Sequence, residues 1–217
     1  KPMIQLHKKT SMRISLLFLL LFVFIGAGMP KAFGQTTEPT EFAIKVSLHG
    51  MGNSGDSINP TNGKLSNKDP DFPQRAVSIS VYTTANQLVT TKTDTITYDY
   101  DANLFRATVD MGNLASGTYI IKIRSPRYLQ KSVQGTVVVA KGKIVTIPEV
   151  TLPAGDINSD NKIDILDYNI LRGCYSEVLP ATFCDNSRLL LSDLSDDGVV
   201  NSYDYNLFIR EIGQTGD

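Results

Sequence analysis

Hydrophobic and polar residues alternate along most of the stretch from Glu41 to Leu152. A period of two marks half-buried β-strands, and these segments are short, rich in β-branched residues and separated by Gly, Asn and Pro. We therefore expect residues 41–153 to form an all-β antiparallel sandwich, with Lys141-Gly142-Lys143 as a tight hairpin connection. The expected strands are 42–48, 76–82, 94–100, 104–110, 118–124, 135–140 and 143–152.

The N-terminal pattern is different, because an apolar run from Ile14 to Gly28 follows three basic residues. The run is shorter than the ~20 residues that span a membrane comfortably, and the small residues Ala32 and Gly34 suit a cleavage site. We expect residues 1–34 to be a secretory signal peptide and residues 35–40 a polar linker. An uncleaved N-terminal anchor is the alternative. Cleavage would give a secreted or cell-surface protein without membrane contact, in a compartment where disulfides persist and calcium is available.

In the last part of the chain the spacing of apolar residues becomes helical, and the sequence repeats. Residues 155–171 recur as residues 192–208, at an offset of 37 residues. Asp164 and Asn201 are good N-cap residues, and apolar residues at helical spacing follow each of them. Each copy is therefore expected to be a loop followed by a helix, so that residues 154–217 form a small α-helical domain.

Each copy contains a twelve-residue loop with oxygen-bearing side chains at positions 1, 3, 5, 9 and 12. Calcium takes about six to eight oxygen ligands, and a loop of this spacing directs these side chains and the carbonyl of position 7 inward. Two copies in register favour two Ca²⁺ ions over the alternative, a solvated acidic turn. The expected ligands are Asp156, Asn158, Asp160, Lys162 (carbonyl), Asp164 and Asp167 in the first loop, and Asp193, Ser195, Asp197, Val199 (carbonyl), Asn201 and Asp204 in the second.

Three further expectations concern the loops. Position 6 needs a positive φ, which Gly198 adopts freely and Asn161 tolerates well. The apolar residues at position 8, Ile163 and Val200, are expected to join the two loops through a short β contact. Four acidic side-chain ligands in the first loop against three in the second predict tighter calcium binding by the first, although Lys162 within that loop opposes this.

A duplicated Asp-rich loop of this pattern, followed by a helix, resembles the dockerin module over about residues 154–214. The resemblance implies a small helical domain in which two calcium loops organise a surface that binds a cohesin domain. In that family positions 10 and 11 help to select the partner, which implies partner-binding roles for Ile165, Leu166, Ser202 and Tyr203. The residues at these positions differ between the two copies, which argues against the symmetric dual binding mode of that family. Packing of Tyr203 and Leu166 inside the module or against the sandwich is the alternative.

Residues 116–131, SGTYIIKIRSPRYLQK, resemble a segment of carboxypeptidase-regulatory-like and transthyretin-like β-sandwiches. Tyr119 and Tyr128 match the aromatic positions of that family, whereas Arg127 stands where the family often has Gly. The resemblance implies a sandwich that serves as a spacer or adaptor, with both tyrosines packed in the core.

Composition excludes several classes of function. The net charge is −1, which gives no electrostatic reason to bind nucleic acid. His7 lies in the expected signal peptide, so the mature chain would keep one histidine. A single histidine makes Ser/His/Asp catalysis unfavourable and excludes a metal site built from several histidines. Cys174 and Cys184 are expected to pair in an exported protein, with free thiols or an intermolecular bridge as alternatives.

These features predict a non-catalytic secreted protein whose C-terminal module mediates calcium-dependent assembly with a cohesin-like or similar partner. The alternative is a structural subunit of a surface or fibre, in which the module packs on its own or a neighbour's sandwich. A carbohydrate-binding module or a polysaccharide-acting enzyme is a third reading. It is disfavoured because Trp is absent and no pair of carboxylates is spaced to flank a cleft.

Overall fold

The computed structural model describes residues 38–52, 69–177, 181 and 183–217. The expected signal peptide and the first half of the linker, residues 35–37, lie outside these residues. Among the described residues, no helix has the length and apolar character needed to cross a membrane. The strands are β1 (Glu41–Leu48), β2 (Gln74–Thr83), β3 (Leu88–Asp99), β4 (Leu104–Asp110), β5 (Gly117–Arg124), β6 (Arg127–Tyr128), β7 (Lys131–Ser132), β8 (Val137–Val139), β9 (Ile144–Thr146), β10 (Val150–Leu152) and β11 (Ala154–Asp156), and the helices are α2 (Ile165–Cys174), α3 (Asn186–Ser192) and α4 (Ser202–Glu211).

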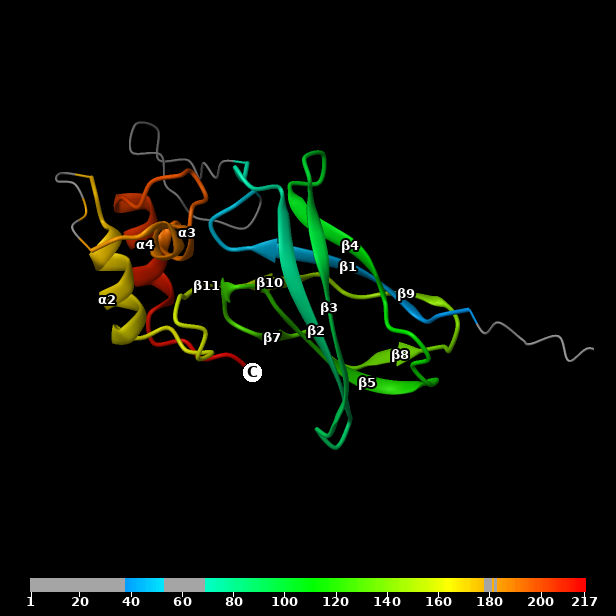
Figure 1. The fold of residues 1–217 in the computed structure, drawn as a ribbon. Coiled ribbons are helices and arrows are strands. Elements are labelled where there is room, and N and C mark those ends of the chain that lie inside the picture. The colour runs from blue at the N-terminus through cyan, green and yellow to red at the C-terminus, as the bar shows by residue number, and fades with distance from the viewer. Residues whose placement is uncertain (1–37, 53–68, 178–180, 182) are drawn as a thin grey trace, which may run out of the picture. The chain divides into compact units, whose positions relative to one another are not determined.

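Nine strands form one sheet in the order β10-β1-β4-β3-β2-β5-β7, with β8 beside β5 and β9 beside β1 (Figure 1). Strands β3 and β4 pair over Thr97–Asp99 and Leu104–Arg106 and then diverge. The two ends of the strand order, β10 and β7, lie in contact. The sheet therefore curls on itself and encloses an apolar core.

The core is built from alternate residues of the strands, because successive side chains in a strand point to opposite faces. Phe42, Ile44 and Val46 of β1 are buried, and so are Val77 and Ile79 of β2. This alternation is the pattern that the sequence displays. The predicted all-β domain followed by a small helical module is confirmed.

Two details of the strand pairing differ from expectation. Strands β9 and β10 both run parallel to β1, so the sheet is mixed rather than purely antiparallel. The expected strand 143–152 is interrupted between β9 and β10, where Pro148 has no N–H to donate to a neighbouring strand. The turn at 141–143 does not close a hairpin, because β8 pairs with β5 whereas β9 pairs with β1.

The C-terminal module begins in contact with the β domain. Strand β11 pairs antiparallel with β6, so Asp156 at the start of the first loop lies opposite Arg127. Helices α2 and α4 follow the two loops, as predicted. Helix α3, which precedes the second loop, was not predicted. Its signal in the sequence is Asp185, which caps the helix by accepting a hydrogen bond from the backbone N–H of Arg188.

The predicted disulfide between Cys174 and Cys184 is present. It joins the last residue of α2 to the chain immediately before α3. A covalent link across so short a loop stabilises the folded module by about 2–3 kcal/mol, because it restricts the unfolded chain.

Gly50, just beyond β1, also brings the β domain close to the module. Its φ is 99°, and a Cβ at this position would lie 2.8 Å from Cδ1 of Leu207 in α4 and 3.1 Å from the carbonyl oxygen of Leu194. Both leucines are buried. The close approach of β1 to α4 therefore requires a residue without a side chain.

Gly50→Ala is expected to lower the free energy of unfolding by about 2 kcal/mol or more, from left-handed strain and overpacking together. Gly112→Ala is the matched control, since Gly112 has a φ of 67° and its Cβ would meet nothing within 4 Å. The control should lose about 1 kcal/mol from strain alone. Equal losses in urea denaturation would contradict the contact between Gly50 and Leu207.

Candidate metal centre

The two repeats fold into loops of the same local structure. Asn161 and Gly198, both at position 6, have φ values of 67° and 83°, as predicted. Asp164 and Asn201 are the N-caps of α2 and α4, and each helix start is a capping box closed by the acidic residue three positions on. The loop and the helix that follows it are therefore one structural unit in each copy.

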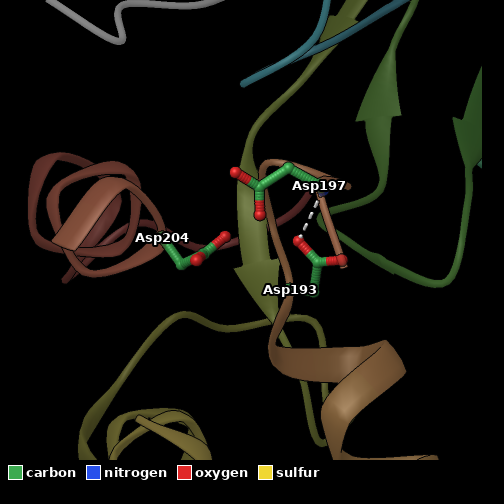
Figure 2. Close-up of side chains that lie close together, drawn as sticks. All are labelled: Asp193, Asp197 and Asp204. Carbon is green, nitrogen blue, oxygen red and sulfur yellow. Dashed lines mark hydrogen bonds between the residues drawn. The ribbon is translucent and has the colours of Figure 1, made fainter. Parts of the chain in front are cut away.

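In the second loop three carboxylates converge. One oxygen from each of Asp193, Asp197 and Asp204 lies within 4.8 Å of the others (Figure 2). Asp204 accepts hydrogen bonds from the backbone N–H groups of Ser195 and Asn201, at 2.8 and 2.9 Å. Asp193 accepts from the backbone N–H groups of Asp197 and Gly198, at 3.1 and 2.9 Å. These backbone donors hold the two carboxylates in place.

The hydroxyl of Ser195, at position 3 of the same loop, is buried and has no hydrogen-bond partner among the described residues. An unsatisfied buried hydroxyl costs free energy unless a further group engages it. A hard cation among Asp193, Asp197 and Asp204 would use this oxygen as an additional ligand. The donor set of the second loop therefore fits calcium.

The first loop shares the backbone pattern but not the surroundings. Asp167 accepts from the N–H groups of Asn158 and Asp164, at 2.9 and 3.0 Å, as Asp204 does in the second copy. Asp156, however, is also bound by Arg124 of β5, at 2.6 Å between Nη2 and Oδ2. Asp160 is exposed and accepts from the backbone N–H of Lys162. The candidate ligands of the two loops thus make similar backbone hydrogen bonds, whereas the side chains around them differ.

Burial raises the pKa of several of these acids. The pKa of Asp204 rises from 3.8 to about 6, chiefly because burial disfavours the charged form, with Asp193 and Asp197 adding to the shift. Burial is also the largest cause of the raised pKa values of Asp156, Asp167 and Asp193. Several buried acids with raised pKa values are what a bound divalent cation would compensate.

The position-8 residues do not pair with each other, contrary to expectation. The carbonyl of Val200 accepts from the N–H of Ser176, and the carbonyl of Ile163 accepts from the N–H of Gly213, at 3.0 and 2.8 Å. Ser176 and Gly213 are equivalent residues of the two copies, just beyond α2 and α4. Each loop is therefore bonded to the chain that leaves the other copy's helix, which gives the module an internal two-fold relation.

Asp196, at position 4 of the second loop, links the loop to the β domain. It is buried and accepts from Arg75 and Arg127, at 2.5 and 2.9 Å, and from the backbone N–H of Phe72. Arg127 also donates to the backbone carbonyls of Leu190 and Asp193. One arginine of the β domain thus holds both the end of α3 and the second loop.

Sequence analysis did not identify this cluster, although a signal for it exists. Arg127 occupies the position at which the sandwich family often has Gly, and its φ is 65°, in the left-handed region that glycine favours. The strain at Arg127 is offset by the buried contacts that its guanidinium makes. A long basic residue in a glycine-like position was the available indication of a structural role.

The four expected partner-binding residues lie on the surface of the module. Ile165 and Leu166 are 60% and 55% exposed, Tyr203 is 37% exposed, and Ser202 is partly exposed. Ser202 donates from its backbone N–H to Glu177, at 3.1 Å. None of the four is packed into the core, in contrast to Leu171, Leu207 and Phe208.

The raised pKa of Asp204 predicts the pH dependence of the calcium-free protein. Between about pH 4 and 6 the folded state binds a proton that the unfolded chain releases, so stability falls as pH rises through this window, by up to about 3 kcal/mol. Asp204→Asn should remove most of this slope in chelator. Denaturation of both proteins at pH 5 and pH 7 measures the difference, and an unchanged slope in the variant would contradict the assignment.

Arg127→Ala is expected to lower the free energy of unfolding by about 3 kcal/mol, because it removes a buried ion pair and two hydrogen bonds to backbone carbonyls. Arg188→Ala is the control, since Arg188 is exposed and its nearest carboxylate oxygen, on Asp185, is 3.9 Å away. The control should change stability by less than about 0.5 kcal/mol. Chemical denaturation that gave similar losses for both variants would refute a special role of Arg127.

Comparison with protein families identifies two regions. Residues 154–213 match the dockerin type I domain, and residues 59–139 match a secretion system C-terminal sorting domain. The second match is thus to a sorting domain, and not to the carboxypeptidase-regulatory-like and transthyretin-like sandwiches that residues 116–131 resemble. No curated protein matches the chain.

Among solved structures, the chain is similar to a chain in each of two type II cohesin–X-dockerin complexes from Acetivibrio cellulolyticus, one with an N-terminal and one with a C-terminal interface mutation. The first similarity has a TM-score of 0.48 and 17% identity, and the second 0.46 and 18%. Both cover 82% of this chain and 97% of the other. From the two family matches, the protein is secreted or at the cell surface, and residues 154–213 are a dockerin-like, non-catalytic assembly module.

Proposed function

We propose that this is a non-catalytic secreted protein whose residues 154–217 bind two Ca²⁺ ions and mediate calcium-dependent assembly with a cohesin-type domain. The observation that carries the proposal is the convergence of Asp193, Asp197 and Asp204 beside the unpaired hydroxyl of Ser195. Residues 1–34 act as the signal peptide in this proposal, and residues 41–153 as a β domain that supports the module.

Calcium would supply charge compensation rather than chemistry. In the second loop it would be held by Asp193, Ser195, Asp197, the carbonyl of Val199, Asn201 and Asp204, and in the first by the equivalent residues from Asp156 to Asp167. Asp167 and Asp204 are also the capping-box residues of α2 and α4. Calcium held by them would therefore offset the cost of burying these charges and link each loop to the start of its helix.

The docking surface would be formed by the helix starts, where Ile165, Leu166, Ser202 and Tyr203 are exposed or partly exposed. The internal two-fold relation of the copies places the two pairs at equivalent positions. One pair is aliphatic, whereas the other joins a hydroxyl to an aromatic ring, so the two sites would prefer different partner surfaces. Aromatic residues such as Tyr203 often dominate the energy of an interface.

The second candidate function is a structural subunit of a surface or fibre. One observation favours its premise that the module packs on the β domain of its own chain. The module contacts the β domain of its own chain through Arg127 and Asp196, and through the pairing of β11 with β6. Packing of the module on the β domain of its own chain is compatible with docking to a partner, because these contacts leave Leu166 and Tyr203 exposed. The two candidates are therefore distinguished by self-association in calcium.

The test is calorimetric titration of the chain, without residues 1–34, with purified cohesin domains in calcium and in chelator. Binding in calcium that chelator abolishes is the expected result. Leu166→Ala and Tyr203→Ala should each weaken binding about tenfold or more at the site used, with thermal stability nearly unchanged. Tyr100→Ala is the control for an exposed tyrosine, since Tyr100 is 57% exposed in the β domain. Calcium-dependent polymers without cohesin binding would favour the structural subunit instead.

A further inference from the structure

The two calcium loops receive different basic side chains from the β domain. In the first loop Arg124 contacts Asp156, which is an expected ligand and is fully buried. In the second loop Arg75 and Arg127 contact Asp196, which stands at a position that provides no ligand. The β domain therefore places a positive charge directly on an expected ligand of the first loop. In the second loop its positive charges contact a residue that lies beside the expected ligands.

In the second loop the two arginines contact Asp196, which is not an expected ligand, and the backbone of Asp193. Arg127 reaches Asp193 through its backbone carbonyl, not its carboxylate. The carboxylates of Asp193, Asp197 and Asp204 converge, and among the residues that the structure describes they are the one group of three acids that does so. The arginines thus hold the loop backbone in place while its three acidic ligands face one another.

The contact in the first loop engages the ligand itself. Nη2 of Arg124 lies 2.6 Å from Oδ2 of Asp156, and the same carboxylate accepts from the backbone N–H of Asn161. The side chain of Arg124 is 29% exposed, so water screens the pair only in part. A cation bound by Asp156 would lie close to this guanidinium and be repelled by it.

We propose that Arg124 opposes calcium at the first loop, so that the second loop binds calcium more tightly and fills first. This rests on the proposed calcium function and reverses the order that the number of acidic ligands predicts. The first loop then fills at higher calcium concentration. By reciprocity, calcium in the first loop weakens the hold of Arg124 on Asp156 and with it one link between β5 and the module.

The effect on the first loop is measured where the second is disabled. The chain without residues 1–34 and carrying Asp193→Asn is titrated with calcium by calorimetry, and the same chain that also carries Arg124→Gln is titrated for comparison. Removing one positive charge beside a divalent ion should raise the affinity of the first loop about tenfold, even with water-like screening. Arg124→Lys, which keeps the charge, should leave the affinity within about threefold of its starting value.

Lys122→Gln is the matched control. Lys122 lies on the same strand two residues away, and its ammonium group is 5.0 Å from the ring of Tyr82, so the variant has the same change of net charge and keeps the contact of Arg124 with Asp156. It should alter the affinity less than about twofold. If Asp193→Asn impairs folding, the chain with both loops intact is titrated with and without Arg124→Gln. The association constant of the weaker calcium site should then rise in the variant.

The outcomes separate the two proposals. No calcium binding by either loop would overturn the proposed function. Binding by both loops, with Arg124→Gln leaving the first loop's affinity unchanged or lowering it, would overturn the role of Arg124 alone. An equal gain from Lys122→Gln would show that net charge, and not the contact with Asp156, sets the affinity.

Discussion

The buried carboxylate of Asp196 is the constraint on which the arrangement of the second loop depends. Burying a charge is costly unless it is paired and hydrogen-bonded, and Asp196 meets this condition through Arg75, Arg127 and the N–H of Phe72. These three partners all come from outside the module. The loop that carries the converging acids is therefore completed by the β domain.

The same dependence appears at the start of the first loop. Strand β11, which ends at Asp156, pairs with β6 of the β domain, and Arg124 contacts Asp156. Residues 154–217 have the repeat and capping of an independent module, yet both of its loops rely on basic residues that precede it in the chain. The β domain thus contributes to the loops and does not act as a spacer alone.

The duplicated module combines equivalence with divergence. The backbone hydrogen bonds of the two copies correspond, including those that Asp167 and Asp204 accept and those that join each loop to the other copy. Side chains at the helix starts and the charges around the loops differ. Backbone symmetry therefore preserves the architecture, while the divergent side chains give the two loops different surroundings and the two helix starts different surfaces.

Much of the structure follows from local patterns in the sequence. The alternation in β1 and β2, the N-caps Asp164 and Asn201, and the positive φ at Asn161 and Gly198 depend on neighbouring residues, so the sequence predicts them. The offset of 37 residues likewise identifies the two loops and the residues expected to bind calcium.

Other features depend on contacts between residues far apart in the chain. The parallel pairing of β9 and β10 with β1, the contact of Arg124 with Asp156, and the enclosure of Asp196 by two arginines have no local pattern. A count of acids within a loop does not include the charge that another strand brings to it. Coulombic interactions and burial act through space, so the tertiary structure alone decided which of these acids are paired with arginine and which face one another.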